Sequence, residues 1–231
     1  MVKKHMKSLA APKTWPIRRK NTTFVIRPSP GPHKFEFSVP LGFVLKNMLV
    51  HANSSREAKK MLINKSFLVN EVRRRDLKFQ IGIFDTLSIE ETKSFFRLIL
   101  NKMGKLSLVR INDDESKSKP CKIIGKTSIK GGKFQLNLYD GRNILINKDG
   151  YKVGDTLIIS LPDNSIKAHL KLEKKSKIFL TGGKHIGEFG VIEDISSNKI
   201  IYKNKNGESV ETLKRHAFVV DNSVYDLNER S

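Results

Sequence analysis

The chain has 231 residues, of which 44 are Lys or Arg and 23 are Asp or Glu, and its formal net charge is +21. Such an excess of one sign destabilises a compact protein by self-repulsion unless a polyanion neutralises it, so the composition favours a nucleic-acid partner. A surface that only confers solubility would mix both signs. No apolar run approaches the eighteen or so residues that span a membrane, so we expect no membrane partner.

The cysteine and histidine content argues against disulfide and metal chemistry. The single cysteine, Cys121, excludes an internal disulfide and a zinc site built from cysteines, and it indicates a reducing intracellular compartment. The six histidines are scattered, without a pair at the i, i+4 spacing of a helical metal site. We therefore expect no metal site and no cofactor.

Residues 1–40 form a basic, proline-rich segment. Nine Lys or Arg residues precede the first acid, Glu36, and five prolines exclude a long helix. We predict an extended arm that is disordered when free and ordered by RNA. Its cations would contact phosphates and its rings would stack on unpaired bases. For Trp15, the alternative is a hydrophobic anchor onto the protein body. The candidate RNA-binding residues of this arm are Lys3, Lys4, His5, Lys7, Lys13, Trp15, Arg18, Arg19, Lys20, Arg27, His33 and Lys34.

Residues 41–105 are expected to form a small α+β module. Apolar residues at helical spacing predict a helix over 42–52, and Ser54 with Glu57 has the spacing of a capping box that begins a second helix. One basic face of the module should contact RNA, although a solvated charged surface explains the same residues. Its residues are Arg56, Lys59, Lys60, Arg73, Arg74 and Arg75. Strands are predicted at 67–69, 82–84 and 86–89.

From residue 95 onward, short apolar runs between turn residues indicate β-structure. We predict a central β-rich domain over 106–171, a small barrel over 172–221 and a polar tail over 222–231. Glycines at 183, 187 and 190 favour a sharply bent loop, with Lys184 and His185 at its tip placed to contact phosphate. An ordinary glycine-rich turn explains this loop equally well. The predicted strands are 97–100, 106–111, 121–127, 134–138, 143–146, 156–160, 178–180, 190–192, 200–202, 210–212 and 217–220.

Several segments resemble the archaeal and eukaryotic small-subunit ribosomal protein S-four-e family. Trp15 and the sequence Arg-Pro-Ser-Pro-Gly-Pro-His-Lys at 27–34 are similar to its N-terminal signature. Ser-Arg-Glu-Ala-Lys-Lys at 55–60 resembles the second helix of the S-four RNA-binding module, and Gly-Lys-His-Ile-Gly-Glu-Phe-Gly at 183–190 resembles the KOW motif. Residues 102–105, 109–111 and 119–122 are similar to the family's central domain. The segments occur in the family's order across nearly the whole chain, which looks like an archaeal-length member.

The resemblance implies an α+β multidomain fold. Its parts are a basic extended arm, an S-four-like RNA-binding module, a central β-rich domain and a C-terminal SH3-like KOW β-barrel. It implies a structural role in the small ribosomal subunit in the cytoplasm, with small-subunit ribosomal RNA and neighbouring small-subunit proteins as partners and no homo-oligomer. It also adds Lys105 and Arg110 as RNA-binding residues. The chain departs from the family at Asn70-Glu71, where members often place Asp-Gly or Asn-Gly. Members use glycine there because it suits the positive φ of a tight turn, so Glu71 puts the turn geometry in question.

No catalytic site is expected. Gly-Lys-Thr at 125–127 ends like a P-loop, but the required earlier glycine falls at Pro120. Asp140-Gly-Arg is faintly similar to a segment of pseudouridine synthases, and a β-turn explains it more simply. An RNA-modifying or RNA-handling factor that uses the S-four-like module as a tether is the alternative function. A long basic arm favours permanent residence on RNA, since an enzyme must release its substrate.

Overall fold

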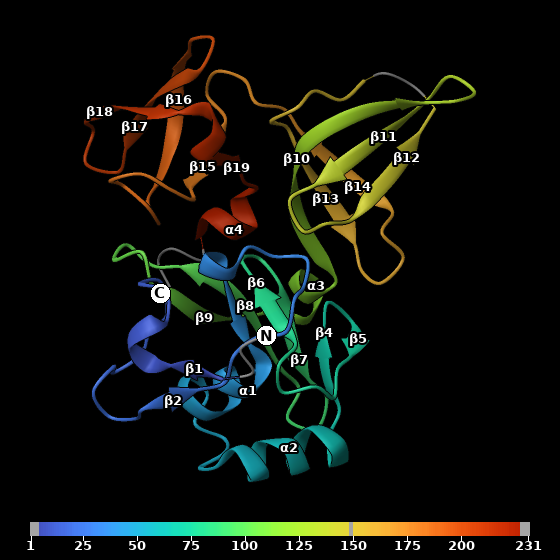
Figure 1. Ribbon diagram of the computed structural model, residues 1–231. Coiled ribbons are helices and arrows are strands. Elements are labelled where there is room, and N and C mark those ends of the chain that lie inside the picture. Colours follow the sequence, from blue (N-terminus) through green and yellow to red (C-terminus); the bar gives the residue numbers. More distant parts are fainter. Residues whose placement is uncertain (1–4, 148–149, 227–231) are drawn as a thin grey trace. The chain divides into compact units, whose positions relative to one another are not determined.

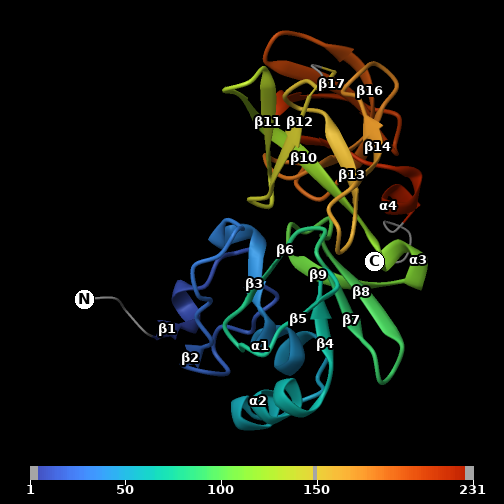
Figure 2. The same cartoon turned by 90° about the vertical axis from the view of Figure 1, so that its right-hand side faces the viewer.

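The computed structural model describes residues 5–147 and 150–226. It divides into two compact units: unit 1 is Met1–Leu100 with Gly104–Lys117, and unit 2 is Asn101–Met103 with Ser118–Ser231. Unit 2 consists mainly of strands, whereas unit 1 has nearly as many helical as strand residues, in short elements (Figures 1 and 2). Among the helices of the described residues, none has the length and apolar character that crossing a membrane requires.

The N-terminal segment of unit 1 is folded, which differs from the predicted extended arm. β1 (Met6–Lys7) pairs with β2 (Phe24–Val25). Trp15 is only 1% exposed, and its indole Nε1 donates a hydrogen bond to the Ser38 carbonyl oxygen at 2.9 Å. Its ring packs against Phe43, with 5.1 Å between the ring centroids. Trp15 is thus a hydrophobic anchor, because burying a large ring whose N–H has a partner is strongly favourable.

The helices of unit 1 lie close to the predicted amphipathic segments. The first helical stretch ends at Met48, earlier than expected, and Val50 after it has a positive φ of 55°. The second helix begins at the predicted cap, since the Ser54 hydroxyl accepts a hydrogen bond from the Glu57 backbone N–H at 3.2 Å. The Glu57 carboxylate accepts one from the Asn53 backbone N–H at 2.8 Å. The segments are α1 (Leu41–Phe43), the π-helical turn η3 (Val44–Met48) and α2 (Ser55–Asn64).

Two antiparallel sheets complete unit 1. β3 (Ser38–Pro40) pairs with β6 (Gln80–Gly82), and a five-stranded sheet has the order β5-β4-β7-β8-β9. Its last strand pairs with β8 along its whole length, so the residues from 106 to 111 belong to this sheet, although the sequence places the domain boundary before them. The strands are β4 (Phe67–Val69), β5 (Val72–Arg73), β7 (Thr86–Ile89), β8 (Ser94–Leu100) and β9 (Leu106–Ile111). The short helices are η1 (Ser8–Ala10), η2 (Phe35–Phe37) and α3 (Asp113–Ser116).

The β4–β5 turn adopts positive φ without glycine. Asn70 has a φ of 52° and Glu71 a φ of 62°. Side-chain hydrogen bonds hold both residues: the Asn70 amide donates to Asp85 Oδ1 at 2.8 Å, and Glu71 Oε1 accepts from the Ser88 hydroxyl at 3.3 Å. The turn therefore keeps the geometry that glycine would favour, at the cost of strain at Glu71.

The first sheet of unit 2 has five strands in the order β12-β11-β10-β13-β14. The long central strand β10 pairs with two strands in turn: its first half, Ser118 to Lys122, pairs with β13, and its second half, Ile123 to Ile129, pairs with β11. A bulge between Ile123 and Gly125 separates the two halves. The core between them includes Cys121, Ile123, Leu136, Leu138, Leu157 and Ile159. The strands are β10 (Ser118–Ile129), β11 (Lys133–Leu138), β12 (Asn143–Ile146), β13 (Thr156–Ser160) and β14 (Ile166–Leu170), the last not predicted.

The second sheet of unit 2 has five strands in the order β18-β17-β16-β15-β19. All five were predicted, with small differences at their ends. Gly190 has a packing role, since an added Cβ would lie 2.4 Å from the Tyr202 ring. The elements are β15 (Lys177–Leu180), β16 (Phe189–Ile195), β17 (Lys199–Asn204), β18 (Ser209–Leu213), η4 (Lys214–His216), β19 (Ala217–Val219) and α4 (Asn222–Asp226).

Candidate nucleic-acid interface

The outer surface of α2 carries three exposed cations, Arg56, Lys59 and Lys60. They occupy the side of the helix away from Ala58 and Leu62, which are completely buried. A helix that buries only one stripe leaves its other residues to solvent or to a partner, and here that free surface is basic. Nothing in the packing of α2 requires these three charges.

The predicted arginine cluster lies close to the end of α2. Arg73 is exposed, and its guanidinium Nη2 donates to the Ile63 carbonyl oxygen at 3.2 Å, which connects β5 to the last turn of the helix. Arg74 is half-buried, with its guanidinium carbon 4.4 Å from the centroid of the Phe79 ring. Arg75 is exposed. Arg73 and Arg75 can therefore extend the basic surface of α2, whereas Arg74 is partly committed to packing.

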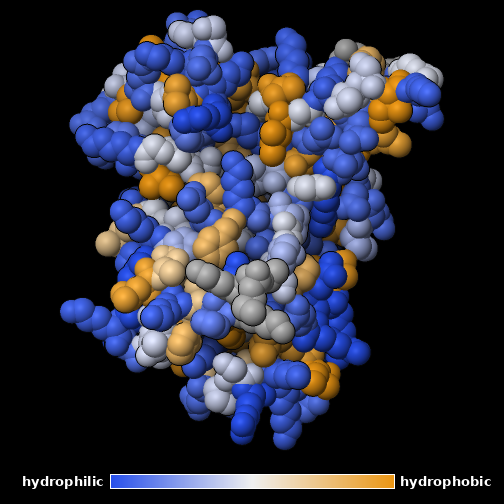
Figure 3. All heavy atoms as spheres, in the orientation of Figure 1, coloured by the Kyte–Doolittle hydropathy of each residue, from blue (hydrophilic) through white to orange (hydrophobic). Residues whose placement is uncertain are grey.

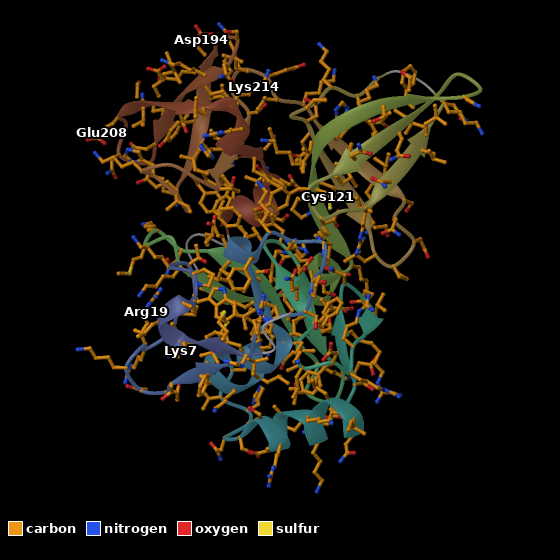
Figure 4. All side chains as sticks on the ribbon, viewed as in Figure 1. Lys7, Arg19, Cys121, Asp194, Glu208 and Lys214 are labelled. Carbon is orange, nitrogen blue, oxygen red and sulfur yellow. The ribbon has the colours of Figure 1, made fainter. Side chains whose placement is uncertain are left out.

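The N-terminal segment presents most of its cations to solvent, and Figure 4 labels Lys7 and Arg19 there. Arg19 differs from the others, because its guanidinium donates to the carbonyl oxygens of Leu9, Ala11 and Pro12 at 2.8, 2.9 and 3.2 Å. It holds the chain reversal of this segment together. Arg27 is half-buried. The exposed predicted residues are His5, Lys7, Lys13, Arg18, Lys20 and Lys34, while Lys3 and Lys4 lie outside the described residues.

Two predicted RNA ligands of this segment are buried, which corrects their assignment. Trp15 occupies the core described above. His33 is 7% exposed, and its Nε2 lies 2.8 Å from Asp85 Oδ2. Its ring packs directly on Gly82, where an added Cβ would lie 2.2 Å from it. Neither ring is placed to stack on a base, because each ring is enclosed by other residues of the protein.

The glycine-rich loop of unit 2 has the predicted bends, with φ of 89° at Gly183 and 83° at Gly187. Lys184 is exposed at the loop. His185 is half-buried, and its Nδ1 lies 3.1 Å from Glu188 Oε1, so its ring is oriented by a neighbour of the same loop. The loop therefore presents Lys184 as an exposed cation. In unit 1, Lys105 and Arg110 are also exposed.

Buried cations in unit 2 are features that the sequence analysis missed. Lys119 Nζ lies 2.9 Å from Asp140 Oδ2, and both side chains are almost fully buried. Asp140 is thus held by a buried ion pair, and its Oδ1 accepts a hydrogen bond from the Arg142 backbone N–H at 3.2 Å, as expected of a β-turn residue. Lys122 donates from Nζ to the carbonyl oxygens of Lys214, Arg215 and Ala217. Burial raises the pKa of the Cys121 thiol, so this cysteine is an inert core residue, as predicted.

Hydrophilic side chains cover most of the face shown in Figure 3, with hydrophobic ones in separate patches. Within the described ranges, no group of three or more His, Cys, Asp or Glu side chains is placed to hold a metal ion. The features left for function are the exposed basic surfaces.

Comparisons with known proteins agree with this picture. Residues 92–166 match the Ribosomal family S4e model, and residues 2–36 match the RS4NT (NUC023) domain. The chain is 39% identical over 232 residues to the small ribosomal subunit protein eS4 of Methanococcus maripaludis, covering 94% of each chain. It is 42% identical over 224 residues to that of Methanosphaera stadtmanae, covering 94% of this chain and 92% of the relative. The chain belongs to the ribosomal protein S4e family.

A solved S4e structure has the same fold. The crystal structure of the 30S ribosomal protein S4e from Thermoplasma acidophilum matches with a TM-score of 0.69 at 29% identity, covering 81% of this chain and 96% of that one. The S4e resemblance inferred from the sequence motifs is therefore confirmed. The S4e model begins at residue 92 and so includes β8 and β9 of unit 1 together with most of the first sheet of unit 2.

Proposed function

We propose that this S4e protein is a structural constituent of the small ribosomal subunit that binds small-subunit ribosomal RNA mainly through phosphate contacts. The observation that carries the proposal is identity of about 40% to small ribosomal subunit proteins eS4 along nearly the whole chain. The net charge of +21 supports it, because such a surplus is neutralised when cations replace the counterions of a polyanion.

Exposed cations from both units would form the RNA contacts. Folded ribosomal RNA offers mainly phosphates and shape, so exposed Lys and Arg side chains suit it best. The α2 surface and its arginine neighbours would act as the S-four-like module, and Lys184 would contact RNA from the loop of a KOW-type, SH3-like barrel. The proposed contact residues are Lys7, Lys13, Arg18, Lys20, Lys34, Arg56, Lys59, Lys60, Arg73, Arg75, Lys105, Arg110 and Lys184.

The same contacts define what the protein does in the subunit. Small units that each hold RNA fix the relative placement of RNA helices, and such a role needs no cofactor and no turnover. Neighbouring small-subunit proteins would be its other partners, and the cytoplasmic ribosome its location. The S4e family is not known to be enzymatic, and the RNA-modifying alternative has no observation in its favour.

Sedimentation of cell extract, with detection of this chain, tests the proposal. We expect co-migration with small subunits that persists after a high-salt wash, since a subunit constituent is held by many contacts at once. Release into the soluble fraction at moderate salt would instead indicate a factor that visits RNA, and the structural role would have to be abandoned.

A further inference from the structure

Part of the first sheet of unit 2 extends beyond its core as a ribbon. Past Lys122, β10 pairs only with β11, which in turn pairs with β12. Residues 127–133 are all exposed and form the far end of this ribbon in Figures 1 and 2. Gly131 and Gly132 at the turn have φ of 84° and 69°, with no atom within 4 Å of an added Cβ. Another molecule can therefore approach this turn closely.

The strand register sorts the side chains of the ribbon onto two faces, because residues paired across strands lie on the same face. One face contains Leu136, which is completely buried in the core of the sheet. The other face, which we call the outer ribbon face, consists of Gly125, Thr127, Ile129, Lys133, Gln135, Asn137, Asn143 and Leu145. Thr127 pairs with Gln135, and Gln135 with Leu145, which is 63% exposed. Hydroxyl and amide groups thus occupy two of the three cross-strand rows of this face, and the row beside the turn holds Ile129 and Lys133.

The ribbon is basic at its end and has no acidic residue along its two long strands. No Asp or Glu occurs between residues 118 and 139. Lys130 and Lys133 flank the glycine turn, are exposed and have no ion-pair partner among the described residues. Some exposed lysines elsewhere in unit 2 do have acidic neighbours, such as Lys174 with Asp194 at 2.8 Å and Lys199 with Glu211 at 2.6 Å. The chemistry at the end of the ribbon is that of a polyanion-binding surface.

The combination of a neutral hydrogen-bonding face and free lysines at its border favours RNA over a protein partner. Protein interfaces are depleted in Lys and enriched in aromatic residues, which the outer ribbon face lacks. An A-form RNA duplex has a wide, shallow minor groove that displays ribose 2′-hydroxyls between two rows of phosphates. Gln135 Nε2 donates to Asn137 Oδ1 at 2.8 Å, which orients the Gln135 amide oxygen as an acceptor beside the Thr127 hydroxyl. These two groups can pair with ribose hydroxyls, and the lysines supply charge for the phosphates.

We propose that the β10–β11–β12 ribbon is a binding site for double-stranded RNA, with its outer face in the minor groove and Lys130 and Lys133 on the adjacent phosphates. The proposal rests on the proposed RNA-binding function and assigns part of it to an element with no predicted RNA ligand. It also accounts for the glycine turn, since backbone N–H groups without side chains beside them can approach a phosphate.

The test uses the full chain and a 20-base-pair RNA duplex, with a DNA duplex of the same sequence for comparison. In Lys130→Gln/Lys133→Gln, we expect the slope of log affinity against log salt to become shallower by about two units. In Thr127→Ala/Gln135→Ala, the salt slope should be kept, whereas RNA affinity should fall roughly two- to tenfold per lost hydrogen bond. DNA affinity should change less, because DNA lacks the 2′-hydroxyl.

Lys174→Gln/Lys199→Gln is the charge control, since it removes the same charge from two exposed lysines of unit 2 outside the ribbon, one before β15 and one on β17. Thermal unfolding of every variant checks that the sheet remains folded. If the lysine variant and the control change the salt slope equally, the ribbon is not a specific site.

A footprint on small-subunit ribosomal RNA separates the ribbon proposal from the proposed RNA-binding function. If the wild-type protein protects no part of the RNA, the RNA-binding function itself is refuted. If the wild type protects the RNA and the ribbon variants give the same protection, only the ribbon proposal is refuted. The ribbon proposal is also refuted if the ribbon cross-links to a protein in intact subunits and its variants do not change RNA binding.

Discussion

Nε2 of His33 lies 2.8 Å from Oδ2 of Asp85, and both side chains are almost completely buried. The same carboxylate accepts hydrogen bonds from the Gly82 backbone N–H at 2.7 Å and from the Asn70 amide at 2.8 Å. One aspartate therefore connects the N-terminal segment, the strand β6 and the β4–β5 turn. The histidine that the family motif suggests as an RNA ligand is, in this fold, a tie between the segment and the module.

Replacement of His33 by Ala should therefore destabilise unit 1. It removes one partner of a buried carboxylate and leaves a cavity beside Gly82, so we expect a loss of about 3 kcal/mol in the free energy of unfolding. Urea unfolding gives this value. His5→Ala is the control, because His5 is exposed in the same segment and its loss should change stability by less than about 0.5 kcal/mol. Equal effects of the two changes would show that the contact with Asp85 is not what matters.

Glu71→Gly should stabilise the protein. Glu71 has a φ of 62°, a conformation that costs an L-residue about 1 kcal/mol and costs glycine little. The gain is partly offset by the lost hydrogen bond from Ser88 and by the greater freedom of glycine in the unfolded chain. We expect a net gain of a few tenths of a kcal/mol in thermal or urea unfolding. Glu71→Ala keeps the strained backbone and loses the hydrogen bond, so it should destabilise; a stabilised alanine variant would contradict the strain argument.

Lys122 should contribute a distinct pH dependence. Burial, with a smaller contribution from the nearby Lys214 charge, lowers the pKa of Lys122 from 10.5 to about 8. Between these two values the unfolded chain keeps a proton that the folded chain has lost, so this group makes the free energy of unfolding rise with pH in that window. Below pH 8 both states are protonated and the slope from this group vanishes.

Comparison of the wild type with Lys122→Met isolates this effect, because contributions from other groups cancel in the difference. The wild type should gain stability relative to the variant as the pH rises from 8 to 10.5, measured by urea unfolding at several pH values. Parallel curves over that window would mean that Lys122 has an ordinary pKa in the folded protein and is more hydrated than its three carbonyl contacts indicate.

Arg56→Gln/Lys59→Gln/Lys60→Gln tests the α2 surface. The changes preserve helix propensity and leave the buried residues untouched, so stability should change by less than about 0.5 kcal/mol per site. Affinity for small-subunit ribosomal RNA should fall, with the salt slope shallower by up to about three units. Lys174→Gln/Lys199→Gln/Lys203→Gln removes the same charge from exposed lysines of unit 2. If both triple variants weaken binding to the same extent, bulk charge explains the result and α2 has no special role.

Local signals in the sequence predicted most elements, whereas pairing and burial were harder to foresee. The cap at Ser54 and the five strands of the last sheet follow from spacing, propensity and turn residues that act over a few positions. The position of β9 depends on which strand it pairs with, which its own residues do not specify. For Trp15 and His33, the composition around them suggested RNA, but a core formed by distant residues buried them. Lys119 and Lys122 were missed for the same reason.

The burial of Trp15 and His33 also has a thermodynamic consequence for assembly. A segment that is already packed on its own protein does not need to lose backbone entropy when RNA arrives, so association should resemble rigid docking more than coupled folding. Calorimetry should then give a modest negative heat-capacity change, set by the interface alone. His33→Ala, if it loosens the segment, should make that change larger and the association entropy less favourable, even though His33 is buried within the protein.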